Sequence, residues 1–368
     1  MKNTLRTLAV LGASTLALAS CGTPPSESGS GGGSDKGGSD FKACMVSDSG
    51  GFKDKSFNES GYRGLQEAKK DLGVETQTAE SQSADQFVPN IDTLVSGQCD
   101  LIFTVGFLLA SATADEAKAN PDTKFAIIDA TAQDKDGNPI EVDNVKPVSF
   151  DTAQASFLAG YLAAGMTKTG KVATYGGAPI PTVTIFMDGF VDGVAQYNKD
   201  HDKDVKTLGW DKDSQKGSFV GNFEDQTKGK SLSDSFYDQG ADIIMPVAGP
   251  VGAGTLASAK EHKNAKVIWV DSDGFETNAD DKKAQKTILT SVMKEIDSSV
   301  VDVTKKTEAG KYDNDPYVGT LENGGVGLAP YHEFEDDVPS ELKGEIDQLK
   351  KDIISGKVKV ESKASPES

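Results

Sequence analysis

The sequence predicts an α/β protein with two doubly wound parallel-sheet lobes, and three observations lead to this fold class. Short apolar runs of strand length alternate with longer amphipathic runs from Phe41 onward. Most of the apolar runs are followed by a loop that carries glycine or aspartate. The chain has 368 residues, 36% of them apolar, so it is too long for one ordinary domain and too apolar to be disordered.

The first strand, loop and helix are the best specified elements. Ser56 and Glu59 form a capping-box pattern at the start of a helix, and Gly73 supplies its stop. Residues 48–55 are therefore a loop between a strand and that helix. Strands are expected over residues 41–47, 101–105, 124–129, 171–175, 243–247, 267–271 and 287–290. Helices are expected over residues 57–72, 84–95, 108–119, 153–166, 183–197, 255–262 and 292–307.

The first forty residues lie outside this pattern. A short basic region, an apolar stretch and small residues make residues 1–20 typical of an export signal. The sequence Leu-Ala-Ser-Cys that ends at Cys21 resembles the bacterial lipobox, so we expect Cys21 to carry lipid such as palmitate. Ordinary secretory cleavage nearby is the alternative. Residues 21–40 are rich in glycine and serine and predict a flexible tether.

The rest of the chain divides into two lobes and a tail. We expect residues 41–150 to form the first lobe, together with part of 272–315. Residues 151–271 form the second lobe, together with part of 316–360, and residues 361–368 are a polar tail. No internal repeat is strong enough to count.

Charge and cysteine content narrow the function classes. The chain has 57 acidic and 38 basic side chains, a net charge of −19, which argues against a nucleic-acid surface because such a surface is basic. Once Cys21 is assigned, Cys44 and Cys99 remain. In an exported protein these two form either a disulfide or a pair of buried free thiols, and their spacing favours neither.

Candidate ligand residues follow from where the strands end. Ligands of open parallel sheets bind beyond the carboxyl ends of the strands, and carboxylates there accept hydrogen bonds from hydroxyls or amines. Phe57 opens the first helix off its apolar stripe, where it either stacks on a planar ligand or anchors the loop. Phe186 is a weaker candidate for the opposite ring face. The residues expected at the strand ends are Asp48, Gly106, Asp129, Gly176, Gly249 and Asp271.

Motifs for cofactors and catalysis are not complete in this chain. A P-loop that ends at Lys230 would need glycine where Glu224 stands, and a calcium loop that starts at Asp211 would need glycine where Lys216 stands. The three histidines lack the spacing of zinc ligands. The sequence therefore predicts no cofactor, no metal ion and no enzymatic activity.

The segment Asp48-Ser-Gly-Gly-Phe-Lys-Asp-Lys-Ser-Phe-Asn-Glu-Ser60 resembles the D-x-G-G-x-x-D-x-S-F-N-x-S signature of the basic membrane protein family. Members of this family are substrate-binding lipoproteins of ABC transporters and include purine nucleoside receptors. Shorter matches lie at residues 186–190, 246–254, 270–273, 290–294 and 325–328. The resemblance extends from about residue 41 to residue 331 and implies a type I periplasmic-binding-protein fold, with two lobes joined by a hinge.

The resemblance also implies a set of ligand residues. Asp48, Asn58 and Asp129 face the ligand from the first lobe, with Phe57 as the stacking ring, and Phe186 is the weaker second ring. Val247 is not aromatic, so the second face of the stack stays open. Lys294 is either a ligand residue or a surface lysine on a helix. The second lobe and the returning chain supply Gly249, Asp271 and Lys294.

The leading hypothesis is a lipid-anchored receptor on the extracytoplasmic face of the cell membrane. It closes around a nucleoside, expected to be a purine nucleoside, and delivers it to ABC permease subunits as a monomer. Two or three carboxylates repel phosphate, which favours a nucleoside over a nucleotide. The alternatives are a sugar receptor on the same fold, a sensor or adhesin that docks a partner protein, and, least favoured, a nucleoside hydrolase.

Overall fold

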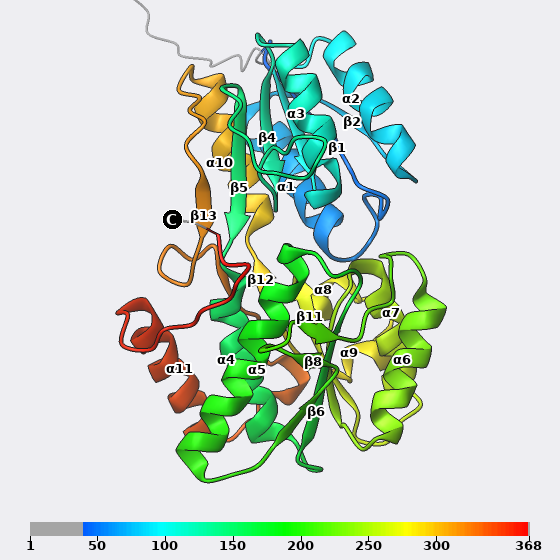
Figure 1. Cartoon of the computed structure of the whole chain (residues 1–368), viewed down its shortest axis with the longest axis vertical. Coiled ribbons are helices and arrows are strands. Elements are labelled where there is room, and N and C mark those ends of the chain that lie inside the picture. The colour runs from blue at the N-terminus through cyan, green and yellow to red at the C-terminus, as the bar shows by residue number, and fades with distance from the viewer. Residues whose placement is uncertain (1–39, 367–368) are drawn as a thin grey trace, which may run out of the picture. The chain divides into compact units, whose positions relative to one another are not determined.

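The computed structural model describes residues 40–366; the predicted export signal, Cys21 and most of the tether lie outside them. Within that range two six-stranded sheets, each covered by helices, form two lobes (Figure 1). The first sheet contains β1 (Lys42–Val46), β2 (Glu75–Ala79), β3 (Leu101–Val105), β4 (Lys124–Ile128), β5 (Val145–Phe150) and β13 (Tyr317–Gly319). The second contains β6 (Lys171–Gly176), β7 (Lys206–Leu208), β10 (Ile243–Val247), β11 (Lys266–Asp271), β12 (Ile288–Lys294) and β14 (Val326–Leu328).

Both sheets have the strand order of a doubly wound α/β fold. The first runs β13-β5-β4-β3-β1-β2 with every pair parallel. The second runs β14-β12-β11-β10-β6-β7, and only β14 is antiparallel to its neighbour. The predicted fold class of two parallel-sheet lobes is therefore confirmed. The two orders correspond strand for strand, a structural repeat that the sequence does not reveal.

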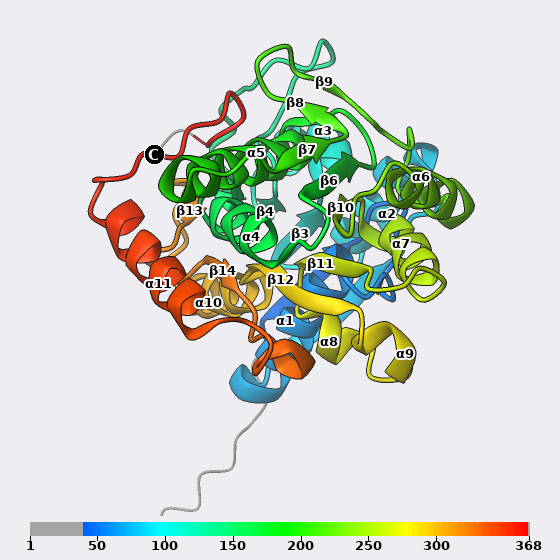
Figure 2. The same cartoon turned by 90° about the horizontal axis from the view of Figure 1, so that it is seen from below.

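Helices cover both faces of each sheet, as Figure 2 shows for the second sheet between α4 and α5 on one side and α6 and α7 on the other. Among the described residues, none of these helices is long and apolar enough to cross a membrane. The first lobe carries α1 (Phe57–Leu72), α2 (Phe87–Ser96), α3 (Ala110–Ala119) and α10 (Ile296–Glu308), and the second carries α4 (Thr152–Met166), α5 (Pro181–His201), α6 (Gln226–Asp238), α7 (Gly252–Ala259), α8 (Gly274–Thr277), α9 (Lys282–Gln285) and α11 (Ser340–Ile354). Shorter elements are β8 (Trp210–Asp211), β9 (Lys216–Gly217) and the 3₁₀ turns η1 (Ala84–Gln86), η2 (Phe107–Leu109), η3 (Gly249–Val251) and η4 (His332–Phe334).

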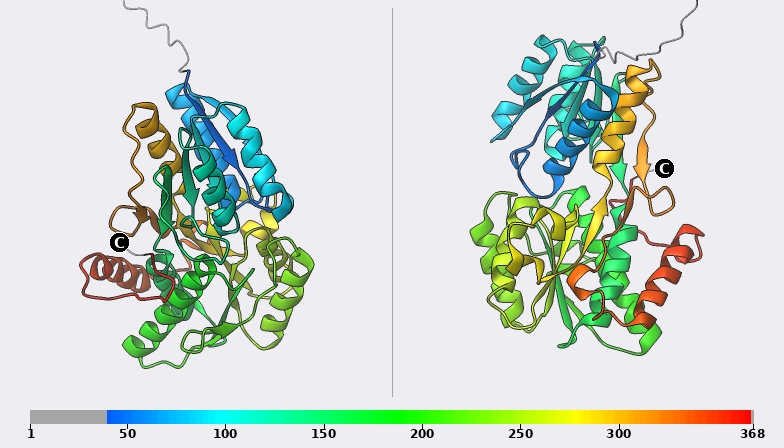
Figure 3. Two further views of the ribbon diagram at one scale, coloured as in Figure 1. Left: turned by 45° about the horizontal axis from the view of Figure 1, so that its top comes forward. Right: turned by 180° about the vertical axis from the view of Figure 1, so that it is seen from behind.

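The chain passes between the lobes three times. It leaves the first sheet after β5 and enters α4, and it returns after β12 to form α10, which packs against α1 (Figure 3). Gly64 of α1 makes this contact possible, because a side chain there would meet the backbone of Asp297 at 2.5 Å. The chain then adds β13 to the first sheet and β14 to the second.

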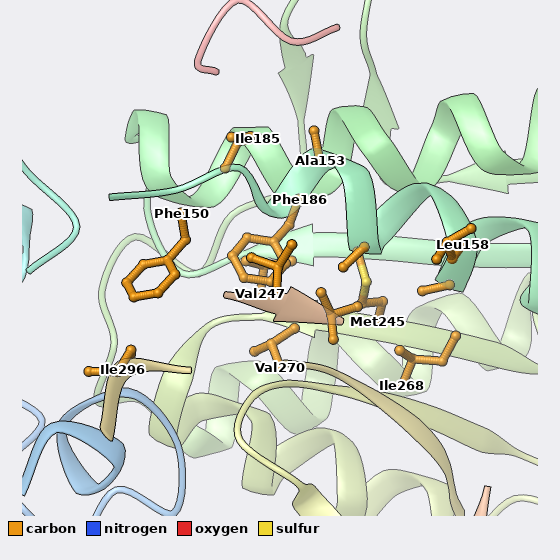
Figure 4. Close-up of a cluster of buried hydrophobic side chains, with 14 of the residues drawn as sticks. Phe150, Ala153, Leu158, Ile185, Phe186, Met245, Val247, Ile268, Val270 and Ile296 are labelled. Carbon is orange, nitrogen blue, oxygen red and sulfur yellow. The ribbon is translucent and has the colours of Figure 1, made fainter. Parts of the chain in front are cut away.

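The position of α5, which carries Phe186, is set by close packing against α4. A side chain at Gly160 of α4 would come within 2.0 Å of the carbonyl oxygen of Phe190, and one at Gly193 of α5 within 1.9 Å of that of Phe157. The two helices therefore touch backbone to backbone. Figure 4 shows the buried cluster below them, in which Phe186 lies beside Val247.

Two local expectations are resolved within the first lobe. Cys44 and Cys99 form a disulfide, which settles the alternative between a bridge and free thiols. The predicted capping box at the start of α1 is wrong: Ser56 makes no side-chain cap. Asp54 caps the helix instead. Its carboxylate accepts from the backbone N–H groups of Ser56 at 3.0 Å, Asn58 at 2.8 Å and Glu59 at 2.9 Å.

Candidate ligand-binding site

The eight residues predicted to bind ligand all line one cavity between the two lobes. The carboxyl ends of β1, β3 and β4 face it from the first lobe, and those of β10, β11 and β12 face it from the second. The strand-end rule therefore brings together side chains that are far apart in sequence. These eight residues are Asp48, Phe57, Asn58, Asp129, Phe186, Gly249, Asp271 and Lys294.

A buried charge cluster lies at the centre of the cavity. The Lys294 ammonium contacts a carboxylate oxygen of Asp129 and lies 3.3 Å from Oδ1 of Asp271. The three side chains are 3%, 6% and 8% exposed, so all of them have lost most of their water. Asp129 comes from the first lobe and the other two from the second. Lys294 therefore forms ion pairs with both lobes.

Burial affects the ionisation of this cluster. Burial raises the pKa of Asp129, although the Lys294 ammonium counteracts it. Burial lowers the pKa of Lys294, but the carboxylates of Asp129 and Asp271 outweigh that effect and leave the pKa above its ordinary value. The lysine consequently keeps its proton, and two carboxylates share one cation.

Lys294 lies at the end of strand β12 and not on a helix, so the predicted helix over residues 292–307 begins too early. The helix starts at Ile296, and residues 288–294 pair in the second sheet, with Val292 opposite Val270 and Lys294 opposite Val326. Six of the seven residues of β12 are buried. A strand buried on both faces lacks the apolar alternation that distinguishes strand from helix. The alternative that Lys294 is a surface lysine is excluded.

Asp48 and Asn58 form a second polar group in the cavity. Oδ1 of Asp48 accepts from the backbone N–H of Gly50 at 3.0 Å and from the Asn58 amide at 2.7 Å. The Asn58 side chain in turn accepts from the backbone N–H of Asp48 at 3.2 Å. Burial raises the pKa of Asp48. Gly106 has a φ of 112°, and a side chain there would come within 2.9 Å of Oδ2 of Asp48, so glycine leaves this carboxylate its space.

Two phenyl rings lie on the same ammonium group. The Lys294 nitrogen is 5.1 Å from the ring centroid of Phe57 and 4.9 Å from that of Phe186. The two centroids are therefore no more than about 10 Å apart. A planar group held between two rings at contact distances of about 3.5–4.0 Å needs ring planes about 7–8 Å apart.

Some cavity residues were not predicted, and one strand-end glycine lies elsewhere. Phe223 lines the cavity from a polar loop that carries no sequence signal for a ligand, and Phe107 lines it next to Gly106, the predicted strand-end glycine after β3. Asp54 also lines the cavity and is the second aspartate of the signature quoted above. Gly176 does not line it, because this residue pairs with Phe219 inside the second lobe.

The side chains that line the cavity can bind a ligand by stacking, hydrogen bonds and charge. The three histidines contact Glu345, Ser258 and Asp273 and are absent from the cavity lining. Residues 40–366 contain no group of three or more His, Cys, Asp or Glu side chains that is arranged to hold a metal ion. The cavity offers four phenylalanine side chains, carboxylate acceptors and one ammonium donor. That combination suits a planar ligand that also carries hydroxyl groups.

Comparisons with known proteins agree with this architecture. The sequence profile described as ABC transporter substrate-binding protein PnrA-like matches residues 41–364. A Lactococcus lactis protein named ABC transporter nucleoside-binding protein BmpA is 32% identical, with 98% of this chain and 99% of that protein covered. Basic membrane protein A1 of Borrelia garinii is 29% identical, with 86% and 87% covered. The crystal structure of an ABC transporter solute-binding protein from Aeropyrum pernix superposes with a TM-score of 0.76 at 25% identity, covering 89% of this chain and 94% of that one.

Proposed function

This chain belongs to the family of PnrA-like ABC transporter substrate-binding proteins, and from that premise we propose that its ligand is a nucleoside, with purines preferred. The family expected from the signature is confirmed, and its members are substrate-binding proteins and not enzymes. One observation carries the ligand proposal. The Lys294 ammonium lies against the rings of Phe57 and Phe186 and also forms ion pairs with two carboxylates, those of Asp129 and Asp271. The Lactococcus relative, named for nucleoside binding, supports it.

The chemistry of the cavity favours an uncharged ligand. The carboxylates of Asp48, Asp129 and Asp271 outnumber the single ammonium of Lys294, so a phosphate group meets net repulsion. Ribose hydroxyls that donate to carboxylates contribute about 1.5–3 kcal/mol each, and a stacked base contributes about 1–3 kcal/mol. Two such bonds and one stack are compatible with a micromolar dissociation constant, which corresponds to about −8 kcal/mol.

A free sugar is the second candidate ligand, because the same carboxylates accept hydrogen bonds from any polyol. The two phenyl rings distinguish the candidates, since a sugar leaves the space between Phe57 and Phe186 without a planar group. Competition between inosine and ribose separates them. Displacement of bound inosine by ribose at similar concentration would favour the sugar receptor.

The place of action is also part of the proposal. Lipid on Cys21 anchors the protein at the extracytoplasmic face, and the two lobes deliver ligand to the permease as a monomer. Replacing Cys21 by alanine then moves the protein from the membrane fraction to the soluble fraction. Retention of the alanine variant in membranes would contradict the anchor. A sensor or adhesin role predicts that nucleoside uptake continues when the gene is deleted.

Thermal unfolding against a ligand panel tests the proposed function directly. The purified protein is stripped of bound ligand by unfolding and refolding and is then mixed with inosine, guanosine, adenosine, cytidine, ribose or galactose. A ligand at a thousand times its dissociation constant adds about 4 kcal/mol of stability. We expect melting temperatures to rise with purine nucleosides. A shift with sugars alone would replace the nucleoside proposal by the sugar receptor.

A further inference from the structure

A set of direct hydrogen bonds joins the two lobes beside the cavity. The backbone carbonyl of Lys55 accepts from the indole N–H of Trp269 at 3.2 Å and from the hydroxyl of Ser272 at 3.1 Å. The hydroxyl of Ser56 donates to Oδ2 of Asp271 at 2.8 Å, and the carbonyl of Val270 lies 3.2 Å away. We call Lys55 and Ser56, together with residues 269–272, the latch.

Most latch residues are buried, and two of them adopt an unfavourable backbone conformation. Ser56 is 0% exposed, Trp269 2% and Ser272 1%. Lys55 and Asp271 both adopt left-handed backbone conformations, with φ of 56° and 70°. A residue other than glycine pays about 1–3 kcal/mol for such a conformation and keeps it only where the surrounding contacts enforce it. Interlobe hydrogen bonds are made by the carbonyl of Lys55 and by the carboxylate of Asp271.

The loop that carries the latch is rigid on the side of the first lobe. Asp54 holds it by accepting from the backbone N–H groups of Ser56 and Glu59. On the other side, β11 ends at Asp271, and Trp269 packs against Gly252 and Gly274 in the core of the second lobe. The latch therefore joins two well-packed surfaces, and relative movement of the lobes breaks its hydrogen bonds.

We propose that the latch stabilises the closed arrangement of the lobes and that Ser56 is a positioning residue for Asp271. Oδ1 of Asp271 faces Lys294 of the same lobe at 3.3 Å, whereas Oδ2 accepts from Ser56 of the other lobe, so the orientation of Oδ2 depends on the lobes being together. When the lobes close, the Ser56 hydroxyl of the first lobe therefore orients the Asp271 carboxylate of the second lobe. The consequence for ligand affinity depends on the proposed nucleoside function, whereas the latch itself does not.

The test removes single donors and follows closure by fluorescence. Trp210 and Trp269 are the two tryptophans of the chain, so Trp210→Phe leaves Trp269 as the only indole reporter. In this background Ser56→Ala and Ser272→Ala each delete one latch donor. Ser233→Ala is the matched control, because its hydroxyl is equally buried but bonds to Gly229 and Thr255 within the second lobe.

We expect Ser56→Ala to make Trp269 more accessible to acrylamide in the absence of ligand, and Ser233→Ala to leave it unchanged. With inosine, the dissociation rate constant rises about tenfold in Ser56→Ala, equivalent to about 1.4 kcal/mol, while the association rate constant stays within twofold. If Ser56 had a purely structural role, Ser56→Ala would instead lower the melting temperature of the ligand-free protein. The inosine dissociation rate constant would then not rise relative to the association rate constant.

Equal quenching of Trp269 in Ser56→Ala and Ser233→Ala would overturn the latch. An inosine dissociation rate constant within twofold of the wild-type value would overturn the positioning role of Ser56. If the wild type does not bind inosine, the proposed ligand fails, but the ligand-free quenching comparison still decides on the latch.

Discussion

The charge cluster of the cavity makes the sharpest prediction. Replacing Lys294 by methionine keeps the length of the side chain but removes the cation that Asp129 and Asp271 share. The two carboxylates, 6% and 8% exposed, then face each other across the lobes without a cation between them. Breaking a buried ion pair by removing one member costs about 3–5 kcal/mol. Because these carboxylates belong to different lobes, the cost opposes closure, and we expect inosine affinity at pH 8 to fall at least about 100-fold.

The loss of inosine affinity in Lys294→Met should depend on pH, because the substitution changes the pKa of Asp129. Burial raises the pKa of Asp129, and Lys294 is the group that counteracts it. Without the lysine this pKa rises further on closure, so the closed form takes up a proton. Closure of the variant is therefore favoured below the raised pKa and is lost as the pH increases through it. The ratio of variant to wild-type dissociation constants should shrink to about tenfold at pH 5.5.

Isothermal titration calorimetry with inosine measures both effects. Titrations in two buffers of different ionisation enthalpy give the number of protons bound, which we expect to be higher for Lys294→Met than for the wild type. Lys230→Met is the control, because it removes a cation from an exposed pair with Asp234 and Glu261 in the same lobe. If Lys294→Met binds inosine within threefold of the wild type at pH 8, or takes up no extra proton, the reasoning about the cluster is wrong.

Three further changes test separate parts of the structure. Phe57→Ala should weaken inosine binding by about 5- to 150-fold, since a stacked base is worth about 1–3 kcal/mol, and an unchanged dissociation constant in calorimetry would remove this ring from the site. Asp54→Ala leaves three backbone N–H groups at the start of α1 without their acceptor and should lower the free energy of unfolding by about 2 kcal/mol in urea titrations; no loss would mean that another group caps the helix. Replacing Cys44 and Cys99 together by alanine should lower that free energy by about 2–4 kcal/mol, and wild-type protein under reducing conditions should match the variant.

The sequence does not predict β5, because Val-Lys-Pro-Val-Ser-Phe is not a continuous apolar run, but it predicts most of the other central strands, which are buried on both faces. Residues 101–105 and 243–247 are continuous apolar runs, which is how such strands read in parallel sheets. The edge strand β2 was missed, since its sequence Glu-Thr-Gln-Thr-Ala contains no buried residue. The antiparallel β14 was missed for a related reason: it has only three residues, and its place depends on pairing with β12.

The candidate site was easier to predict than the details of its support. The end of a parallel strand is a fixed place in the fold, so Asp48, Asp129 and Asp271 could be assigned to one rim before any side chain was placed. The hydroxyl of Ser56 could not be assigned in this way. Its spacing to Glu59 matches a local cap, but in the structure the backbone N–H of Glu59 donates to Asp54, and the Ser56 hydroxyl donates to Asp271, 215 residues away. A local capping pattern is therefore a poor guide to the contacts of a serine where the other lobe supplies a carboxylate that accepts from its hydroxyl.

The corresponding strands explain how two similar lobes produce an asymmetric site. Ile128 pairs with Val148 in the first sheet as Val270 pairs with Val292 in the second, so Asp129 and Asp271 occupy matching positions after these residues, both with positive φ. By the same register, the place of Lys294 in the second lobe is taken in the first by Phe150, a buried core residue. The repeat therefore supplies the acidic residue twice and the basic residue once. Two carboxylates approach each other when the lobes close, and a single lysine on the strand that leads to the crossing makes this closure electrostatically favourable.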